Sequence, residues 1–462
     1  MYKFIIEGIE NTNQYEELIK VFLTQEEYAL ISRDDMQNAE FQDEDQSAQP
    51  HIFKEFCFEG DKDKLKREIY RFLEKETGKS PKWGILTGIR PVKLAGEMTD
   101  QLGGDEALKK LDDEYLLHPE KSRLITNILD YQRKLLGKPE KDSLSIYLGI
   151  PFCPTRCLYC SFTSNQVKKP EIDRYLEALH KEIEYCGAKM AQRNDAPESL
   201  YIGGGTPTTL DEVQLEGLLK KISECFDLSR LKEFTVEAGR PDTITPEKLE
   251  VMKRYGVDRI SINPQSMKQH TLELIGRAHT VDQTLEAFKM ARDAGFDCIN
   301  ADLIAGLPEE GLEDFKNSVD TMINLGAENI TVHTLAVKRA SRLKELDAEF
   351  NYRREDLREE MLTYAHEALG KAGYEPYYLY RQKHTSGNTE NIGFCKKDLI
   401  SAYNVRIMEE AQSILALGAG GISKVYYPDE NRLERVANVS NYEIYIDRID
   451  EMILRKENNF WR

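Results

Sequence analysis

The sequence lacks long apolar runs, a secretion signal and an excess of positive charge. No run of about 18 apolar residues occurs, so we expect no membrane-spanning helix. The first residues, MYKFIIEGIENTNQ, lack the apolar core and the small-residue cleavage site of a signal peptide, so we expect a cytoplasmic protein. The 63 basic and 81 acidic residues give a net charge of −18, which argues against a general binder of nucleic acid or of anionic membranes.

Cysteine is scarce, and it is unevenly distributed. Three of the eight cysteines lie together, and no second C-x-x-C and no H-x3-H accompanies them. A structural zinc site usually takes four ligands from paired motifs, which disfavours zinc. An odd local count without a signal peptide disfavours disulfides. Four cysteines outside this group are expected to be small core residues, namely Cys57, Cys186, Cys225 and Cys298. The sequence around Cys395 does not show whether it is also a core residue.

The cysteines that lie together follow a short apolar run that is typical of a strand. The stretch 147–162, YLGIPFCPTRCLYCSF, places Cys153, Cys157 and Cys160 in a C-x3-C-x2-C spacing. Three thiolates on one tight loop can hold three irons of a [4Fe–4S] cluster and leave the fourth iron without a protein ligand. Such an open iron suits chemistry rather than storage of an electron. Zinc and three unrelated cysteines are the alternatives.

Strand-like and helix-like segments alternate over residues 143–340. The candidate strands are SIYLGI, SLYIGGG, EFTVEAG, RISINPQ, CINADLIAGL and NITVHTL. Between them, Thr209-x-x-Glu212 and Thr280-x-x-Gln283 are expected capping boxes. Alternating strands and helices imply a parallel sheet. We therefore predict an α/β fold, a partial TIM-like (β/α)6 barrel, with its chemistry at the carboxyl ends of the strands.

The flanking regions predict two further domains. Residues 1–142 are expected to form a small N-terminal α/β domain with a helical extension, in which the acidic segment 32–50 is an exposed loop or hairpin. Residues 341–462 are expected to form a helix-rich C-terminal domain. The segment WGILTGIRPVKLAGEM, residues 83–98, is either a packing segment between domains or a lid that contacts an anion through Arg90.

A run of glycines ends the second candidate strand. In GGGTPT, the three glycines 203–205 precede Thr206 and Pro207. Glycines at a strand end let a ligand approach the backbone closely and leave N–H and C=O groups free to bind it. A tight structural turn is the alternative. After a three-cysteine loop, the pattern favours a site for the methionyl amine of S-adenosylmethionine (SAM).

Taken in order, the motifs resemble those of a known family. The cysteine loop, GGGTPTTL, VEAGRPD, NPQS, IGRAHT, DLIAGLP and LALGAGGIS are similar to motifs of the radical SAM family of oxygen-independent coproporphyrinogen III oxidases and their relatives. The resemblance covers about residues 145–425. WGILTGIRP and YLYRQK resemble segments of the HemZ branch, the coproporphyrinogen dehydrogenase-like proteins.

The resemblance implies a role for each matching residue. Cys153, Cys157 and Cys160 would ligate the [4Fe–4S] cluster, and SAM would chelate the fourth iron through its amine and carboxylate. The remaining residues would form the SAM site, in which Arg277 pairs with a carboxylate and Asp302 accepts from hydroxyl or amine donors; these residues are Tyr147, Tyr159, Gly204, Gly205, Thr206, Glu237, Gln265, Arg277, Asp302, Ala336 and Ile422. Considered singly, Arg277 could be a surface charge, Asp302 a strand-end cap and Glu237 a buried ion-pair partner.

The family reaction indicates a substrate and an electron donor. A reduced cluster splits SAM into methionine and a 5′-deoxyadenosyl radical, which abstracts a propionate β-hydrogen; loss of CO2 and one electron leaves a vinyl group. Two rounds convert coproporphyrinogen III to protoporphyrinogen IX. The donor would be a flavodoxin or ferredoxin. A polyanionic substrate needs a local basic patch, and the candidates, each of which could be an ordinary surface charge, are Arg90, Lys93, Arg381, Lys383 and His384.

Two departures from the family pattern keep other functions open. The decarboxylase loop has an additional cysteine two residues after the third ligand, where this chain has Phe162. That form occurs in HemW, the haem-chaperone branch, which binds and delivers haem. The chaperones also have an HNxxYW-type haem motif, and this chain has HTSGNTENIGF instead. A haem-binding chaperone, or a radical SAM enzyme that alkylates or opens a tetrapyrrole, are therefore the alternatives to decarboxylation.

Overall fold

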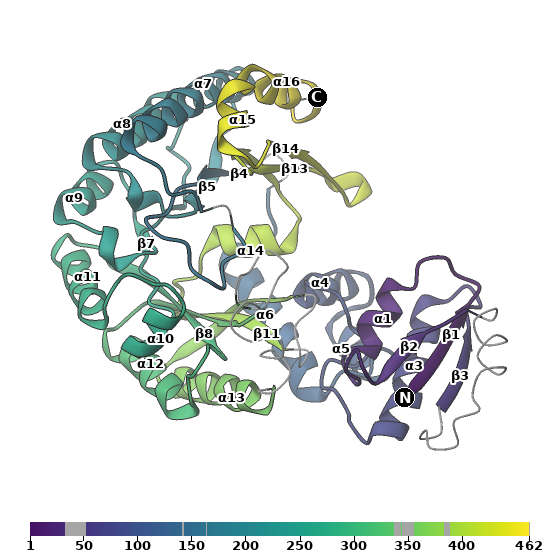
Figure 1. Ribbon diagram of the computed structural model, residues 1–462. Helices are drawn as coiled ribbons and strands as arrows, with labels where there is room; N and C mark the ends of the chain where they lie inside the picture. Colours follow the sequence, from purple (N-terminus) through teal and green to yellow (C-terminus); the bar gives the residue numbers. More distant parts are fainter. Residues whose placement is uncertain are drawn as a thin grey trace. The chain divides into compact units, whose positions relative to one another are not determined.

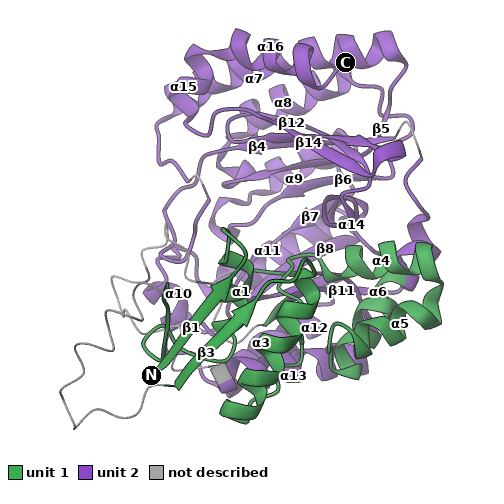
Figure 2. Ribbon diagram, turned by 90° about the vertical axis from the view of Figure 1, so that its right-hand side faces the viewer, with its two compact units in different colours: residues 1–129, 380–390 green, residues 130–379, 391–462 purple. Residues whose placement is uncertain are grey.

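The computed structural model describes residues 1–32, 52–140, 143–162, 164–336, 343, 355–382 and 389–461. The chain forms two compact units (Figure 2). Unit 1 comprises Met1–Leu129 and Tyr380–Glu390, and unit 2 comprises Asp130–Leu379 and Asn391–Arg462. These units do not coincide with the expected boundaries at 142 and 340, and the three-domain division stays a prediction. No helix in the described part of the chain combines the length and the apolarity that a bilayer crossing requires.

Unit 2 contains the predicted partial barrel. All six candidate strands form, and each pairs in parallel with the next; they are β4 (Leu144–Ile150), β5 (Pro197–Gly204), β6 (Glu233–Glu237), β7 (Arg259–Ser261), β8 (Cys298–Ala305) and β9 (Asn329–Thr334). Helices lie outside this arc of strands (Figure 1); they are α7 (Lys169–Arg193), α8 (Glu212–Cys225), α9 (Pro246–Arg254), α10 (Gln269–Leu274), α11 (Val281–Asp293), α12 (Leu312–Asn324) and α13 (Glu355–Lys371). The prediction of a (β/α)6 barrel is confirmed.

One of the two expected capping boxes is confirmed and the other is wrong. Helix α11 begins after Thr280, whose side chain accepts from the N–H of Gln283 while the Gln283 side chain accepts from the N–H of Thr280. Helix α8 begins instead after Asp211, which makes the same box with Gln214. Thr209 belongs to the 3₁₀ turn Pro207–Thr209, and so it lies too early in the chain to cap α8.

The chain after residue 355 adds strands to the barrel sheet. The complete sheet has 11 strands in the order β10-β11-β9-β8-β7-β6-β5-β4-β12-β13-β14. The added strands are β10 (Tyr374–Arg381), β11 (Glu390–Lys396), β12 (Ser413–Leu417), β13 (Ile422–Tyr427) and β14 (Arg432–Ala437). Four helices accompany them, α13, α14 (Ala402–Glu409), α15 (Tyr442–Asp447) and α16 (Ile449–Asn459). The region expected to be helix-rich thus contains strands as well as helices, because aromatic and β-branched residues in segments such as YYLYR and ISKVYY favour strands.

The segment before α14 closes the amino-terminal end of the barrel. Two buried barrel residues hold it: Arg259 donates to the carbonyls of Leu399 and Ile400, and Glu233 accepts from the Ser401 hydroxyl and the Ala402 N–H. Helix α14 itself lies within the arc of strands (Figure 1). Because this end is closed, the carboxyl ends of the strands are left to carry a site.

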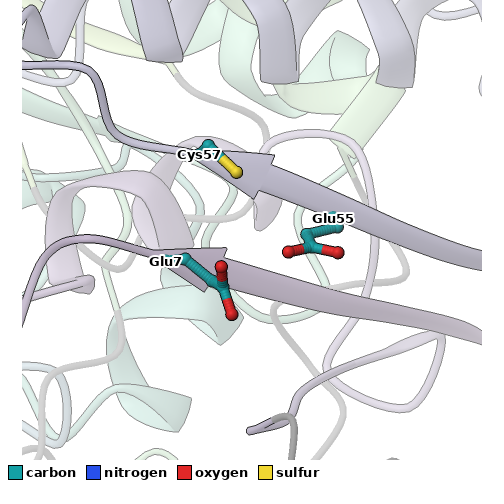
Figure 3. A group of neighbouring side chains, drawn as sticks. All are labelled: Glu7, Glu55 and Cys57. Carbon is teal, nitrogen blue, oxygen red and sulfur yellow. The ribbon is translucent and has the colours of Figure 1, made fainter.

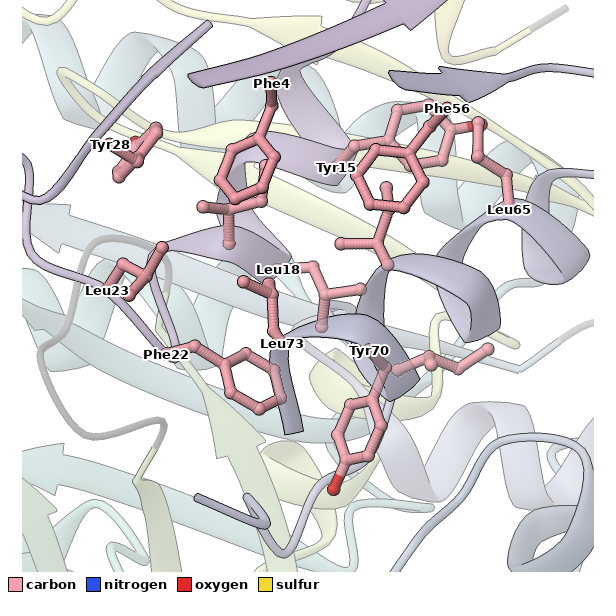
Figure 4. Close-up of a cluster of buried hydrophobic side chains, with 13 residues drawn as sticks. Phe4, Tyr15, Leu18, Phe22, Leu23, Tyr28, Phe56, Leu65, Tyr70 and Leu73 are labelled. Atoms are coloured by element: carbon pink, nitrogen blue, oxygen red, sulfur yellow. The ribbon is translucent and has the colours of Figure 1, made fainter. Parts of the chain in front are cut away.

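Unit 1 is built on a small parallel sheet. Strands β1 (Tyr2–Glu7), β2 (Tyr28–Leu30) and β3 (Ile52–Cys57) pair in the order β2-β1-β3. Helices α1 (Asn13–Ile19) and α3 (Lys62–Thr77) bury Phe4, Leu18, Phe56 and Leu73 against it (Figure 4). The helices α4 (Pro91–Leu102) and α5 (Gly104–Asp113) follow, and then α6 (Pro119–Leu136), whose last turns belong to unit 2. The expected α/β unit is confirmed, and residues 33–50 of the predicted acidic loop lie outside the described residues.

Candidate functional site

The cysteine loop follows β4 and is fixed by backbone hydrogen bonds at three points. The Cys153 N–H donates to the Asn165 carbonyl at 3.1 Å, the Leu158 N–H to the Ile275 carbonyl at 2.9 Å, and the Cys160 N–H to the Cys157 carbonyl at 3.2 Å. The loop is therefore held against the segment after α10, and its three thiols are half to fully buried. Burial raises the pKa of Cys153 to about 11, so that iron must displace a proton there.

The three loop sulfurs are not all as close together as the ligands of a single ion. Around one zinc, with Zn–S bonds of about 2.3 Å, sulfurs lie about 3.8 Å apart. Among the described residues, the group whose ligand atoms all lie within 4.8 Å of one another is Glu7, Glu55 and Cys57, and not the loop cysteines. At least one pair of loop sulfurs therefore lies more than 4.8 Å apart, which is wider than the spacing around one zinc.

The run of glycines brings three predicted site residues together. A Cβ on Gly203 would lie 2.9 Å from the Glu237 carboxyl carbon, and one on Gly204 would lie 3.4 Å from the Tyr147 hydroxyl. A Cβ on Gly205 would meet the Cys153 sulfur at 3.0 Å. At all three positions protein atoms lie where a side chain would begin, so only glycine lets the end of β5 pack this closely against its neighbours.

Glu237 accepts a hydrogen bond from one of three stacked tyrosines. Tyr147 of β4 and Tyr201 of β5 lie side by side with ring centroids 6.3 Å apart, and Tyr403 of α14 stacks on Tyr201 at 4.5 Å. The Tyr201 hydroxyl donates to Glu237 at 2.6 Å. Burial raises the pKa of Glu237 to about 7, although the hydrogen bond from Tyr201 opposes the shift. A buried carboxylate of this kind would be stabilised by a cationic ligand.

Gln265, which follows β7, lies beside Asp302 within β8. The Gln265 N–H donates to the Asp302 carbonyl at 2.9 Å. Gln265 is buried, and no described residue donates a hydrogen bond to its Oε1. Although burial disfavours its charged form, the hydrogen bond and charge of His333, 3.5 Å away, hold the pKa of Asp302 below its ordinary value. A buried acceptor without a protein donor is a fitting contact for the N–H or O–H groups of a bound ligand.

Two buried arginines flank the loop on another side. Arg277 donates to the Tyr159 hydroxyl at 3.0 Å and to the carbonyls of Gly239 and Asn263. Arg240, which sequence reasoning did not single out, donates to the Cys157 sulfur at 4.0 Å. Between these charges, burial first and then the two guanidiniums lower the pKa of His279 to about 3. The alternative that Arg277 is only a surface charge is excluded by its burial, 8% exposed.

The remaining predicted residues are less closely connected. Thr206 donates to the Cys153 sulfur at 3.4 Å, as a residue beside the cluster would. Ala336 follows the end of β9, and Ile422, 48% exposed, begins β13. Among the described residues, the contacts that join the other site residues do not extend to these two. Tyr201, Arg240 and Tyr403 were missed: the first two lie within quoted motifs, whereas Tyr403 is about 200 residues distant in sequence.

The basic residues expected for substrate carboxylates lie in unit 1 or outside the described residues. Arg381 is buried, 6% exposed, with its guanidinium 4.8 Å from the centre of the Trp83 ring. Its backbone N–H donates to the Ile89 carbonyl at 2.8 Å, and burial lowers its pKa to about 10. Arg381 therefore ties the segment 380–381 to WGILTGIRP, which is a packing role. Lys93 pairs with Glu97 at 3.9 Å; Lys383 and His384 lie outside the described residues.

The expectation that Cys57 is a core residue is wrong. It is exposed on the open face of β3, because the strand alternates and directs the neighbouring Phe56 into the core. Glu7 and Glu55 lie beside it (Figure 3). Exposed acidic groups beside a lone thiol are common without an ion, and this group is not part of the site.

Comparisons with known proteins agree with this geometry. Residues 147–322 match the Radical SAM superfamily, whose members use a [4Fe–4S] cluster and SAM. An oxygen-independent coproporphyrinogen-III oxidase-like protein, HemZ, of Bacillus subtilis is 39% identical over 409 residues, 87% of this chain and 81% of that protein. A heme chaperone, HemW, of Lactococcus lactis is 31% identical over 331 residues, 70% of this chain and 79% of that protein.

A solved structure supports the fold. The coproporphyrinogen III oxidase HemN of Escherichia coli, a radical SAM enzyme, matches with a TM-score of 0.55 at 23% identity and covers 69% of this chain and 72% of that one. At this identity the likeness concerns the fold alone. The match to the superfamily and the identity to HemZ over most of both chains agree with the cysteine loop and the strand-end residues. The chain therefore belongs to the radical SAM family of oxygen-independent coproporphyrinogen-III oxidase-like proteins.

Proposed function

We propose that the protein is a radical SAM enzyme of tetrapyrrole metabolism that decarboxylates two propionates of coproporphyrinogen III to vinyl groups without oxygen. The observation that carries the proposal is the buried Gln265 Oε1 beside Asp302, to which no described residue donates a hydrogen bond, on the barrel that carries the three-cysteine loop. Binding groups for a polar ligand at strand ends, together with cluster ligands, suit an enzyme with a reactive SAM site better than a purely structural cluster. The 39% identity to HemZ over 87% of the chain favours the tetrapyrrole class.

Each site residue has a role in this proposal. The loop cysteines would ligate the cluster, and Gly204, Gly205 and Thr206 would receive the methionyl end of SAM. Glu237 would compensate the positive charge of SAM in the low-dielectric barrel, because its carboxylate is held next to the glycines. Asp302 and Gln265 would accept hydrogen bonds from SAM, and Arg277 would hold Tyr159 and face the SAM carboxylate. Ala336 and Ile422 would supply apolar walls.

The cofactors supply the radical chemistry, a one-electron cleavage of SAM, and the protein supplies position and exclusion of water. Arg259 and Glu233 hold residues 399–402 at the amino-terminal end of the barrel. In this proposal, that segment keeps solvent from entering the barrel at its amino-terminal end. The tyrosine stack covers the wall next to Glu237. These features confine the reaction to the end of the barrel that carries the cysteine loop.

The test is an anaerobic assay of the reconstituted protein with SAM, a strong reductant and coproporphyrinogen III. Mass spectrometry should detect protoporphyrinogen IX with two equivalents of 5′-deoxyadenosine, and Cys157→Ala should give neither product. Formation of 5′-deoxyadenosine without a changed porphyrin would mean that the SAM site works on another substrate, and it would reject decarboxylation.

A second candidate is a haem-binding chaperone. Phe162, 68% exposed, occupies the position two residues after the third cysteine where the decarboxylases have a further cysteine. The 31% identity to the Lactococcus lactis heme chaperone points the same way. In this case the protein should bind haem with a defined Soret band and transfer it to an apo-haemoprotein, and it should leave coproporphyrinogen III unchanged.

A further inference from the structure

The guanidinium of Arg240 lies beside the cysteine loop and has different hydrogen-bond partners on its two sides. Arg240 follows β6, and its side chain is 4% exposed. Its Nε and Nη2 donate to the two carboxylate oxygens of Asp242 at 3.0 and 3.1 Å. Its Nη1 donates to the Thr155 hydroxyl at 3.0 Å and lies 4.0 Å from the Cys157 sulfur. The arginine thus connects the turn after β6 with two residues of the cysteine loop.

The second arginine beside the loop is engaged differently. Arg277 directs its nitrogens at oxygens, namely the Tyr159 hydroxyl and the carbonyls of Gly239 and Asn263. Arg240 by contrast directs one nitrogen at a cysteine that the proposed function assigns to the cluster. The bidentate pair with Asp242 fixes the plane of the guanidinium, and Thr155 fixes the side that faces the loop.

We propose that Arg240, oriented by Asp242, acts as a positioning residue that donates a hydrogen bond to the Cys157 sulfur and raises the reduction potential of the cluster. This inference rests on the proposed cluster site but not on the identity of the substrate. The reduced cluster carries one more negative charge than the oxidised cluster, so a buried cation next to a ligating sulfur stabilises the reduced form. Hydrogen bonds to cluster sulfurs and the net charge around them are established determinants of potential.

The lysine and glutamine variants separate charge from geometry. Arg240→Gln removes the charge, whereas Arg240→Lys keeps it but cannot pair with both Asp242 oxygens and the loop at once. Asp242→Asn keeps the arginine and removes the negative charge that compensates it. The matched control is Arg254→Gln in α9, whose ion pair with Glu216 lies at the surface, where the arginine side chain is 57% exposed.

The experiment is a redox titration followed by electron paramagnetic resonance on reconstituted, full-length protein, with iron and sulfide measured per chain. At the midpoint of the wild type, Arg240→Gln should lower the ratio of reduced to oxidised cluster about tenfold, a shift of about 59 mV for a one-electron couple. In Arg240→Lys, the midpoint potential should shift in the same direction by less than half as much. In Arg254→Gln, the midpoint potential should not shift.

Asp242→Asn should shift the midpoint in the negative direction, because the guanidinium loses the bidentate carboxylate that holds it at the loop, whereas loss of a negative charge alone would shift the midpoint the other way. This second variant decides the question alone if Arg240→Gln fails to load a cluster. A wild-type midpoint in a fully loaded Arg240→Gln protein, or a positive shift in Asp242→Asn, overturns the inference. The titration needs no tetrapyrrole, so failure of the decarboxylation assay leaves it intact, whereas a wild type that binds no iron rejects the cluster site itself.

Discussion

The Tyr201 hydroxyl donates a 2.6 Å hydrogen bond to the Glu237 carboxylate, and the two residues belong to neighbouring strands of the barrel. This hydrogen bond does not offset the cost of burying the ionised carboxylate. Burial raises its pKa from 4.5 to about 7, and the nearby Asp302 adds to the shift. The site thus keeps a carboxylate that is costly without a ligand and becomes favourable when a cation lies beside it.

This setting predicts a pH-dependent contribution to stability. The folded state binds the Glu237 proton more tightly than the unfolded state, so the contribution is fully present below pH 4.5 and is lost as the pH rises to about 7. Glu237→Gln should remove this loss. In denaturant titrations without SAM, the variant should gain free energy of unfolding relative to the wild type as the pH rises through this window. Parallel pH profiles would contradict the raised pKa.

Tyr201→Phe provides the complementary change. It removes a hydrogen bond that lowers the pKa of Glu237, so the pKa should rise further above 7. The upper end of the pH window in which stability is lost should move to higher pH, while its lower end stays at the pKa of the unfolded chain. The variant should bind SAM more weakly at neutral pH if the ionised carboxylate compensates the sulfonium. The shift is measured from the same denaturant titrations, with isothermal calorimetry for SAM. An unchanged window would show that the hydrogen bond has no influence on the ionisation of Glu237.

The cluster assignment predicts the effect of a single loop cysteine. Cys157→Ala should fold and stay soluble but lose the iron, because two thiolates cannot hold three irons. The control is Cys57→Ala in unit 1, where the thiol is exposed on β3 and outside the loop. Iron analysis and the visible absorption of the reconstituted proteins report the outcome. A Cys157→Ala protein with full iron content would contradict the assignment.

Sequence reasoning predicted the barrel because its signals are local. The six strands, the cysteine spacing and the glycine run each occupy a short, continuous segment. The order of the motifs then indicated residues such as Gln265 and Asp302, which the structure places side by side on and after neighbouring strands. Contacts made across long separations were not accessible. Tyr403 joins the tyrosine stack from α14, and the partners of Arg381 in unit 1 lie about 300 residues earlier in the chain.

A different limit applies where two local signals compete. Thr209 and Asp211 both offer a capping box for α8, and the sequence does not say which of them starts the helix. The preceding Pro207 allows a 3₁₀ turn that uses Thr209, and this moves the cap to Asp211. In the same way, the alternation in β3 does not reveal that one face stays open and leaves Cys57 exposed.

The close approach at Gly205 predicts a severe effect of one methyl group. A Cβ at this position would lie 2.5 Å from the Phe152 carbonyl oxygen and 3.0 Å from the Cys153 sulfur, so the loop would have to move. Gly205→Ala should therefore reduce iron loading strongly. Gly217→Ala in α8 is the control, since nothing lies within 4 Å of its Cβ and alanine should stabilise the helix by about 1 kcal/mol. Equal iron content in both variants would show that the loop tolerates the displacement.

A buried ion pair in unit 2 predicts the largest loss of stability. Lys456 of α16 and Glu182 of α7 lie 2.6 Å apart, and both side chains are fully buried. Although burial disfavours the ionised carboxylate, Lys456, Tyr445 and the Gly418 N–H hold the pKa of Glu182 below its ordinary value. Lys456→Met would leave this charge without a cation, and such a loss costs about 3–5 kcal/mol.

The matched control for that substitution is Lys371→Met, which removes a surface pair with Glu367 whose side chains are 79% and 62% exposed. This change should cost less than about 0.5 kcal/mol, because water screens an exposed pair. The double variant Lys456→Met with Glu182→Gln should recover part of the loss, since it removes the uncompensated charge along with the cation. Denaturant titration measures all three. If Lys456→Met cost no more than the surface variant, the buried carboxylate would have to be protonated rather than ion-paired.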